Sequence, residues 1–243
     1  MEVIPDKIFI IPYRNREAQK IHFEIYMKYI LEDEIDGSYK IFFVHQKDNR
    51  PFNRGAMKNI GFLVVKDIFP LHYKNITIVF NDIDTIPYKK NLLNYNTKPG
   101  VVKHFYGFIF ALGGIVSITG GDFEKILGFC NSWGWGLEDN VLNNRVLNSG
   151  LNIDRSNFYK ILDQKIIHIN DNIKKILSKQ EPWRYSSDTS DSILDIKNLK
   201  YTINNEFIDV ENFDTKYPFN HEVYYTASER KKIVPDKRFI IKN

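Results

Sequence analysis

The first third of the chain alternates strand and helix patterns, and polar residues follow each strand. Short apolar runs predict three buried strands, over residues 7–11, 41–44 and 76–80. The helix predicted over 16–34 carries Ile21, Ile25 and Tyr29 at helical spacing, and a second helix over about 55–68 ends before Pro70. A βαβαβ order predicts a largely parallel sheet with helices on its faces, where ligands gather at the carboxyl ends of the strands.

Shorter elements are predicted in the remainder of the chain. Thr119 and Asp122 resemble a capping box for a short helix that ends at Gly128, and Gly150 ends a helix over 138–149. Further strands are expected at 116–119 and 165–168, loop and irregular strand at 88–110, a polar helix or loop at about 170–195, and antiparallel strands in the tail at 199–243. The fold class is therefore α/β, with a mostly parallel central sheet flanked by helices and a small antiparallel C-terminal part.

Composition narrows the class of protein. The chain has 243 residues and a net charge of +4, which fits a single domain and does not indicate a dedicated nucleic-acid binder. Its one cysteine, Cys130, allows no internal disulfide. No apolar run is long enough to span a bilayer, and the first residues do not resemble a signal peptide, so we expect a cytoplasmic protein without a transmembrane segment.

The segment Trp133-Gly134-Trp135-Gly136-Leu137-Glu138-Asp139-Asn140 combines aromatic, flexible and acidic residues. Tryptophans give flat apolar faces, and glycines let the backbone bend closely around a ligand. The two carboxylates open a predicted helix, where the helix dipole favours negative charge. A packed aromatic turn before ordinary helix-starting acids is the alternative, but the compact combination favours a sugar-binding platform beside a base.

Two carboxylates follow the third predicted strand in Asn81-Asp82-Ile83-Asp84. Hard carboxylate oxygens suit Mg²⁺ or Mn²⁺, which bridge phosphate oxygens. A polar turn that closes a strand is the alternative for an isolated motif of this kind. His168 ends a later strand and is a candidate metal ligand if it lies opposite these acids.

Arginines follow the first strand and precede the second helix. Arg14 and Arg16 lie in Ile11-Pro12-Tyr13-Arg14-Asn15-Arg16, where two guanidinium groups suit a pyrophosphate. In Phe52-Asn53-Arg54, the aromatic ring can stack on a base and the arginine can meet a phosphate. Taken singly, these arginines fit ordinary surface positions equally well.

Together with Gly113-Gly114, these motifs occur in the same order as in the β-1,4-galactosyltransferase family of inverting glycosyltransferases. The chain resembles this family over residues 7 to 210. The details are most similar to the members that act on xylose in proteoglycan linkers. The resemblance implies a GT-A fold in a single domain over 1–243, with a nucleotide-binding half at 7–87 and an acceptor-binding half with the C-terminal strands at 88–243. It also implies a UDP-sugar donor, a glycan acceptor and Mn²⁺, with Mg²⁺ as an alternative metal.

The resemblance assigns a role to each matching residue. Asp139 is the expected catalytic base, helped by Glu138; Asp84 and His168 are the expected metal ligands, with Asn170 as a third candidate. Donor-binding residues are expected to be Pro12, Arg14, Arg16, Phe52, Arg54, Asp82, Ile83 and Trp135. Acceptor-binding residues are expected to be Trp135, Gly136, Leu137, Glu138, Asp139 and Asn140.

The chain departs from the family pattern at several positions. Asn140 replaces a third acidic residue, and Lys165 or Asn170 stands where the family has a further metal ligand. Ala111 stands where many members have a tyrosine that helps select galactose over N-acetylgalactosamine, so the donor could be either UDP-sugar. The membrane anchor and disulfides of Golgi members are absent from this sequence.

The sequence therefore predicts a metal-dependent inverting glycosyltransferase. One alternative is a catalytically silent protein that binds a sugar or nucleotide sugar on the same fold. A second alternative, a nucleotidyltransferase, is disfavoured because its chemistry needs no stacking surface for an acceptor sugar. The exact donor, the acceptor and the oligomeric state do not follow from the sequence.

Overall fold

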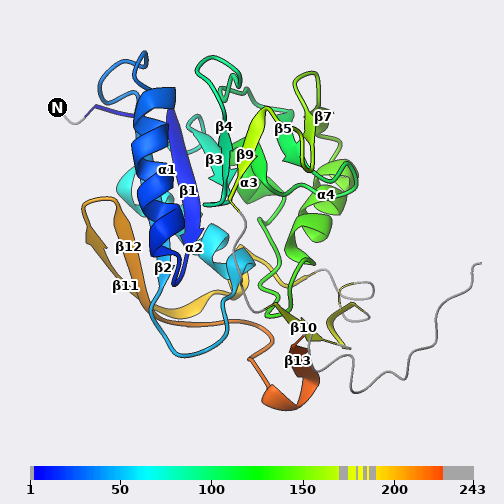
Figure 1. Cartoon of the computed structure of the whole chain (residues 1–243). Coiled ribbons are helices and arrows are strands. Elements are labelled where there is room, and N and C mark those ends of the chain that lie inside the picture. The colour runs from blue at the N-terminus through cyan, green and yellow to red at the C-terminus, as the bar shows by residue number, and fades with distance from the viewer. Residues whose placement is uncertain (1–2, 170–174, 179, 183–184, 186–189, 227–243) are drawn as a thin grey trace, which may run out of the picture.

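The computed structural model of the chain describes residues 3–169, 175–178, 180–182, 185 and 190–226. A nine-stranded sheet, in the order β11-β12-β2-β1-β3-β6-β5-β7 with β8 paired to β5, forms its centre (Figure 1). The three predicted strands are β1 (Lys7–Tyr13), β2 (Tyr39–Gln46) and β3 (Thr77–Asn81), and β1 pairs in parallel with both others. The predicted α/β class is confirmed.

The helices α1 (Glu17–Ile30) and α2 (Arg54–Ile68) connect these strands and cover opposite faces of the sheet. Successive residues of β1 point to opposite faces, as the pleat of a strand requires. Ile8 and Ile10 belong to the apolar cluster that includes α2, whereas Phe9 and Ile11 belong to the cluster that includes α1. A strand buried on both faces has no polar alternation, which is why β1 reads as a continuous apolar run.

The buried face of α1 differs from the one that its isoleucines mark. Ile21, Ile25 and Tyr29 are 48%, 66% and 45% exposed, whereas Phe23, Met27 and Ile30 are buried. The helix carries two apolar stripes, both with the i, i+4 spacing of a helix face, so spacing alone cannot choose between them. Contact with the sheet determines which stripe is buried, because the Phe23 ring packs against the Phe43 ring of β2 at a centroid distance of 5.9 Å.

The second half of the sheet is mixed. β6 (Ile115–Thr119) runs antiparallel to β3, and β5 (Val101–Gly107) runs antiparallel to β6, although the region 88–110 was expected to be mostly irregular. β7 (Asn152–Asp154) and β8 (Tyr159–Lys160) pair in parallel with β5. β4 (Thr85–Pro87) and β9 (Ile166–His168) form a separate antiparallel pair, which brings the end of β9 to the loop after β3.

Two helices follow in this half. In α3 (Gly120–Lys125), the Thr119 hydroxyl accepts from the Asp122 N–H, as predicted, but the helix ends three residues before Gly128. Leu127 and Gly128 both have a φ of +64°, which a helix cannot continue through. α4 (Glu138–Asn148) confirms the predicted helix and begins directly at the acidic pair.

The C-terminal hairpin of β11 (Lys197–Asn204) and β12 (Phe207–Asp214) is antiparallel, as predicted. It also extends the central sheet, because β12 pairs in parallel with β2. A second small antiparallel pair joins β10 (Ile176–Ser178) to β13 (Tyr224–Thr226), and short 3₁₀ turns lie at η1 (Ile193–Asp195) and η2 (His221–Val223). The predictions for 170–174 and for the tail beyond 226 fall outside the described residues.

None of the helices among the described residues combines the length and the apolar character needed to cross a bilayer. The cytoplasmic location and the division into two halves at residue 87 stay predictions.

The buried face of α1 leads to a paired stability test. Phe23→Ala should lower the free energy of unfolding by about 3–5 kcal/mol, because it removes a fully buried ring and leaves a cavity. Ile25→Ala, on the exposed stripe of the same helix, should change it by no more than about 0.5 kcal/mol. Urea unfolding of both variants measures the difference, and equal losses would contradict the assignment of the buried face.

Candidate functional site

A pocket opens where the carboxyl ends of β1 and β3 meet the first residues of α2 and α4. We call it the central pocket; its polar lining includes Arg16, Arg54, Asp82, Asp84, Asp139, Asn140, His168 and Lys175. Its apolar and glycine lining includes Tyr106, Phe108, Phe110, Ala111, Gly113, Gly114, Trp135 and Gly136. The topology brings together most of the residues that the sequence singled out, because each follows a strand or begins a helix at this edge of the sheet.

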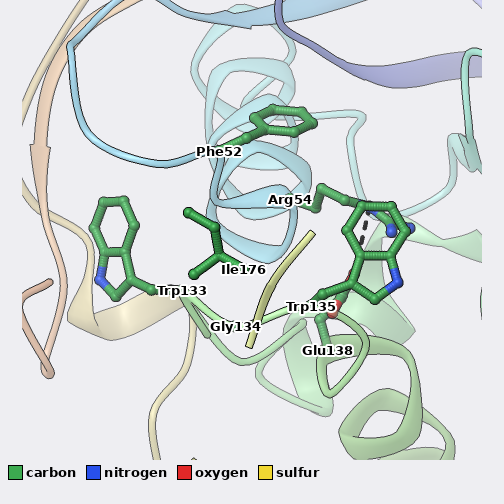
Figure 2. A pocket seen from close by; sticks show the side chains of 7 residues that line it. All are labelled: Phe52, Arg54, Trp133, Gly134, Trp135, Glu138 and Ile176. Carbon is green, nitrogen blue, oxygen red and sulfur yellow. Dashed lines mark ion pairs between the residues drawn. The ribbon is translucent and has the colours of Figure 1, made fainter. Parts of the chain in front are cut away.

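Arg54 is the centre of the charged network in the central pocket. Asn53 caps α2 by accepting from the Ala56 N–H at 2.9 Å, which places Arg54 at the first position of the helix. Its guanidinium lies 3.1 Å from Asp82. Its Nε lies 3.4 Å from a Glu138 carboxylate oxygen, and Figure 2 marks this ion pair with a dashed line. Arg54 also lies 3.8 Å from Asp139. This one cation therefore interacts with three carboxylates from two other elements.

A second cation, Lys58, was missed by the sequence analysis. It follows Arg54 by one helical turn on α2, and its side chain is 2% exposed. Its Nζ lies 3.1 Å from Asp139 Oδ1 and 3.8 Å from Asp82 Oδ1. The signal was present in the sequence, because residues four apart share a helix face and Arg54 already marked the face that meets the pocket.

Burial and charge shift the protonation of these groups in different directions. Burial raises the pKa of Asp139 to about 6, and Glu138 and Asp82 add to this, against the opposing effects of Lys58 and Arg54. Burial also disfavours the charge on Asp82, but Arg54 and Lys58 outweigh it and hold the Asp82 pKa below its usual value. Asp139 can therefore accept a proton near neutral pH, whereas Asp82 stays anionic.

The Gly113-Gly114 pair explains how Asp139 fits. A Cβ atom at Gly113 would lie 2.2 Å from Asp139 Oδ2, so only glycine leaves room for the carboxylate there. Gly114 has a φ of +72°, which glycine adopts without strain, and its carbonyl accepts from the Asp82 N–H at 2.9 Å. The glycine pair therefore shapes the floor beneath the acidic groups.

Asp84 and His168 lie next to one another at the opposite side of the network. Thr85 pairs with His168 across β4 and β9, and the Ile169 N–H donates to the Asp84 carbonyl at 2.8 Å. The Asp84 carboxylate lies 3.5 Å from Arg16, and burial, followed by repulsion from Asp82, raises its pKa. An added cation would relieve this repulsion.

A carboxylate oxygen and an imidazole nitrogen suit Mn²⁺. Asn170, the third candidate ligand, falls outside the described residues. Within the described part of the chain, no group of three or more His, Cys, Asp or Glu side chains could hold a metal ion. The observed candidate is thus a two-ligand site.

The two tryptophans of this segment have different environments. Trp133 is 1% exposed and stacks on Phe213 of β12 at a centroid distance of 5.7 Å, so it belongs to the core. Trp135 lines the central pocket, with Arg54 and Lys175 at 4.5 and 4.7 Å from its ring centroid. Figure 2 shows the two indoles diverging on either side of Ile176. Of these two rings, only that of Trp135 lines the central pocket.

A buried carboxylate that the sequence analysis also missed holds this aromatic turn. Glu181 is 1% exposed and accepts from the Trp133 and Gly134 N–H groups at 3.0 and 2.7 Å. The hydroxyls of Ser132 and Tyr224 donate to it at 2.8 and 2.6 Å. A distant glutamate in a polar stretch gives no sequence signal for this contact.

Several predicted residues lie in or around the site without facing the central pocket. Pro12 and Ile83 are buried, and the Ile83 side chain is part of the core, so a ligand could reach Ile83 only through its backbone. Arg14 donates to the Arg50 carbonyl in the loop after β2. Phe52, with Arg54, Trp135 and Glu138, lines an adjoining pocket, which Figure 2 shows from close by.

Residues 136–140, which surround the acidic pair, lie in different environments. Glu138 is 2% exposed and accepts from the Gly136 N–H at 3.2 Å, which braces the turn from behind. Gly136 and Asn140 line the central pocket, and the partly exposed Leu137 packs against a small cluster that includes Val141. The predicted acceptor contacts of these residues stay predictions.

Two family models match the chain. Residues 5–96 match the N-terminal region of glycosyl transferase group 7, and residues 102–170 match a model described as the N-terminal domain of galactosyltransferase. The two matches are consecutive and together span more than half of the chain. The chain belongs to the group 7 glycosyltransferase family. The resemblance seen in the sequence motifs is thereby confirmed.

Curated relatives of this family are β-1,4-galactosyltransferases. β-1,4-galactosyltransferase 1 of Mus musculus is 34% identical over 167 residues, which are 64% of this chain and 40% of the relative. Xylosylprotein 4-β-galactosyltransferase of Caenorhabditis elegans is 31% identical over 155 residues, which are 60% of this chain and 52% of the relative. The chain thus spans about half the length of these relatives or less.

Solved structures of the family share the fold. The catalytic domain of Drosophila β-1,4-galactosyltransferase 7 in complex with xylobiose has a TM-score of 0.69 and 22% identity, over 87% of this chain and 95% of that chain. A mutant of that enzyme, in complex with manganese, UDP-Gal and xylobiose, has a TM-score of 0.68 and 21% identity over the same shares. The predicted GT-A type fold is confirmed.

The Glu181 contacts generate a stability prediction for the aromatic turn. Glu181→Ala should lower the free energy of unfolding by at least about 2 kcal/mol, because it leaves two buried N–H groups and two hydroxyls without their acceptor. The neighbouring exposed Gln180 provides the control, and Gln180→Ala should have an effect within about 0.5 kcal/mol. Chemical denaturation followed by tryptophan fluorescence measures both, and a neutral Glu181→Ala would contradict a bracing role.

Proposed function

We propose that this chain is a metal-dependent inverting glycosyltransferase that moves galactose from UDP-galactose to a hydroxyl group of a sugar acceptor. The observation that carries the proposal is the position of Asp139, a carboxylate with a pKa of about 6 beside the Trp135 ring in a pocket that also holds Asp84 and His168. Family membership supports the reaction class, and the relatives are named galactosyltransferases.

Asp139 acts as the general base in this proposal. Its carboxylate takes the proton of the acceptor hydroxyl while that oxygen attacks the anomeric carbon of the donor sugar. The bond between the anomeric carbon and the diphosphate oxygen breaks, and UDP leaves with the bonding electrons. Attack from the face opposite the leaving group inverts the configuration. A pKa near 6 leaves Asp139 largely deprotonated at neutral pH and still basic enough to accept the proton.

The donor side of the site is cationic. Arg16 and Arg54 line the central pocket and provide planar arrays of N–H donors for a diphosphate. Phe52 lies at the adjoining pocket, in a position suited to stacking on a base, and Arg14 reaches the loop that leads to Phe52. Arg54 pairs with the carboxylates of Asp82 and Glu138, so a bound diphosphate would share its N–H groups with these partners.

Asp84 and His168 would hold the metal ion, and Mn²⁺ fits this oxygen and nitrogen set. A mutant of the Drosophila relative has a solved structure in complex with manganese. When bound, the ion would supply positive charge near the diphosphate of the donor. Arg16 lies close enough to Asp84 to orient its carboxylate.

Ala111 bears on the choice of donor sugar. It lines the central pocket and is 6% exposed, whereas the neighbouring Phe110 is 62% exposed. A small side chain at this position supports acceptance of UDP-N-acetylgalactosamine besides UDP-galactose. The acceptor is proposed only as a sugar, because Trp135 offers a single aromatic face.

The role of Asp139 is tested by Asp139→Asn. This variant should lose at least about a hundredfold in turnover with UDP-galactose and a xylose-containing acceptor, because an amide cannot accept the proton. It should still bind UDP, measured by calorimetry, since the proposed nucleotide contacts are intact. Asp67→Asn, an isosteric change on the exposed side of α2, is the control. Turnover within a few-fold of the wild type at saturating acceptor would refute the assignment.

The metal requirement is tested by chelation. UDP release should fall to background in EDTA and should return with Mn²⁺ better than with Ca²⁺, which prefers larger oxygen-rich sites. Asp84→Asn should raise the Mn²⁺ concentration needed for half-maximal activity. Full activity in EDTA would contradict the metal proposal, and UDP binding without any UDP release, across donors and metals, would favour a silent sugar-binding protein.

A further inference from the structure

Lys58 is an unusual residue for its position. It lies in the buried first half of α2, where the neighbouring Ala56, Met57 and Ile60 are apolar core residues. A lysine is almost never fully buried unless its charge is paired. Its ammonium group has a carboxylate oxygen of Asp139 at 3.1 Å and lies 4.7 Å from the centroid of the Phe129 ring.

The two oxygens of the Asp139 carboxylate have different contacts, because Lys58 lies next to one and Arg54 is closer to the other. Oδ1 receives the hydrogen bond from Lys58 Nζ, whereas Oδ2 faces the Gly113 backbone and has Arg54 at 3.8 Å. The hydrogen bond to Oδ1 fixes the rotation of the carboxylate about its own axis. The second oxygen is thereby held toward the pocket side, where Gly113 leaves space.

The charges around Asp139 come from three elements. α2 contributes Arg54 and Lys58, the loop after β3 contributes Asp82, and α4 contributes Glu138. Two carboxylates thus repel the charge of Asp139 and two cations stabilise it. Arg54 also interacts with Glu138 and Asp82, so it divides its charge among three acids. Lys58 lies closer to Asp139 than to Asp82, so most of its charge acts on Asp139.

We propose that Lys58 is a positioning residue for the transfer reaction: its buried ammonium group orients the carboxylate of Asp139 and keeps it in the anionic, proton-accepting form. This inference rests on the proposed function, in which Asp139 is the base. Burial alone disfavours a charged lysine, but Asp139 and Asp82 together hold the Lys58 pKa above its usual value, so the cation persists throughout the working pH range. Lys58 is not among the residues that line the central pocket, so its effect on the reaction would pass through Asp139.

The pH dependence of turnover tests the proposal. In the wild type, kcat should rise with pH through a midpoint near 6, as Asp139 loses its proton. Lys58→Met keeps the length of the side chain and removes the charge, so the midpoint should move up by about one pH unit or more, the usual effect of losing an opposite charge at this distance. Turnover at pH 6 should then fall by at least about fivefold, with a smaller loss at pH 9. Lys58→Arg should retain most of the wild-type profile.

Controls separate this role from a structural one. Lys66→Met, on the same helix but with a half-exposed side chain, should leave the profile unchanged. Circular dichroism shows whether the variants fold. Lys58→Gln gives a second neutral variant, and unfolding of both neutral variants would assign Lys58 to stability and overturn the proposal.

The remaining outcomes distinguish the proposed role of Lys58 from the proposed role of Asp139. If Asp139→Asn is inactive and folded Lys58→Met has an unshifted profile, Asp139 is the base but Lys58 does not position it. If Asp139→Asn retains turnover, the proposed function of Asp139 fails, whatever Lys58 does. A shift in Lys58→Met that Lys58→Arg reverses would support both assignments.

Discussion

The site is organised by the pairing of two cations on the first turns of α2 with three carboxylates from other elements. Arg54 and Lys58 lie one helical turn apart, and they reach Asp82 after β3 and the acidic pair at the start of α4. Buried charges are tolerated only when they are paired, and removing one partner leaves the others uncompensated. This network therefore fixes three elements relative to one another at the edge of the sheet where ligands gather.

Much of the fold follows from local sequence patterns. β1 and β3 are continuous apolar runs because both faces of the sheet are covered, and the parallel pairing follows from the helices between the strands. The buried face of α1 was not predictable, because two stripes share one spacing and only contact with Phe43 distinguishes them. The parallel pairing of β12 with β2 was also hidden, since no local pattern links segments so distant in the chain.

The candidate site was predictable to the extent that its residues lie at strand and helix ends. Asp82, Asp84 and Asp139 were identified in this way, and the structure brings them to one pocket. Lys58 was overlooked because a lysine in a helix normally faces solvent. Glu181 was overlooked because two of its partners are backbone N–H groups, which the sequence does not distinguish, and the others lie far from it in the chain. The different environments of Trp133 and Trp135 were also hidden, because they depend on a distant strand, β12, which packs against Trp133.

The contact between Trp133 and β12 has a consequence for the order in which the protein matures. Trp133 stacks on Phe213, and Arg50, from the loop after β2, lies over both rings and donates to the Phe213 carbonyl. The aromatic turn that carries Trp135 is thus supported by a strand made late in synthesis, and β2 keeps an open edge until that strand arrives. During translation, the aromatic turn gains this support only after β12 has left the ribosome, so the turn takes its final packing after the strands that precede it in the chain.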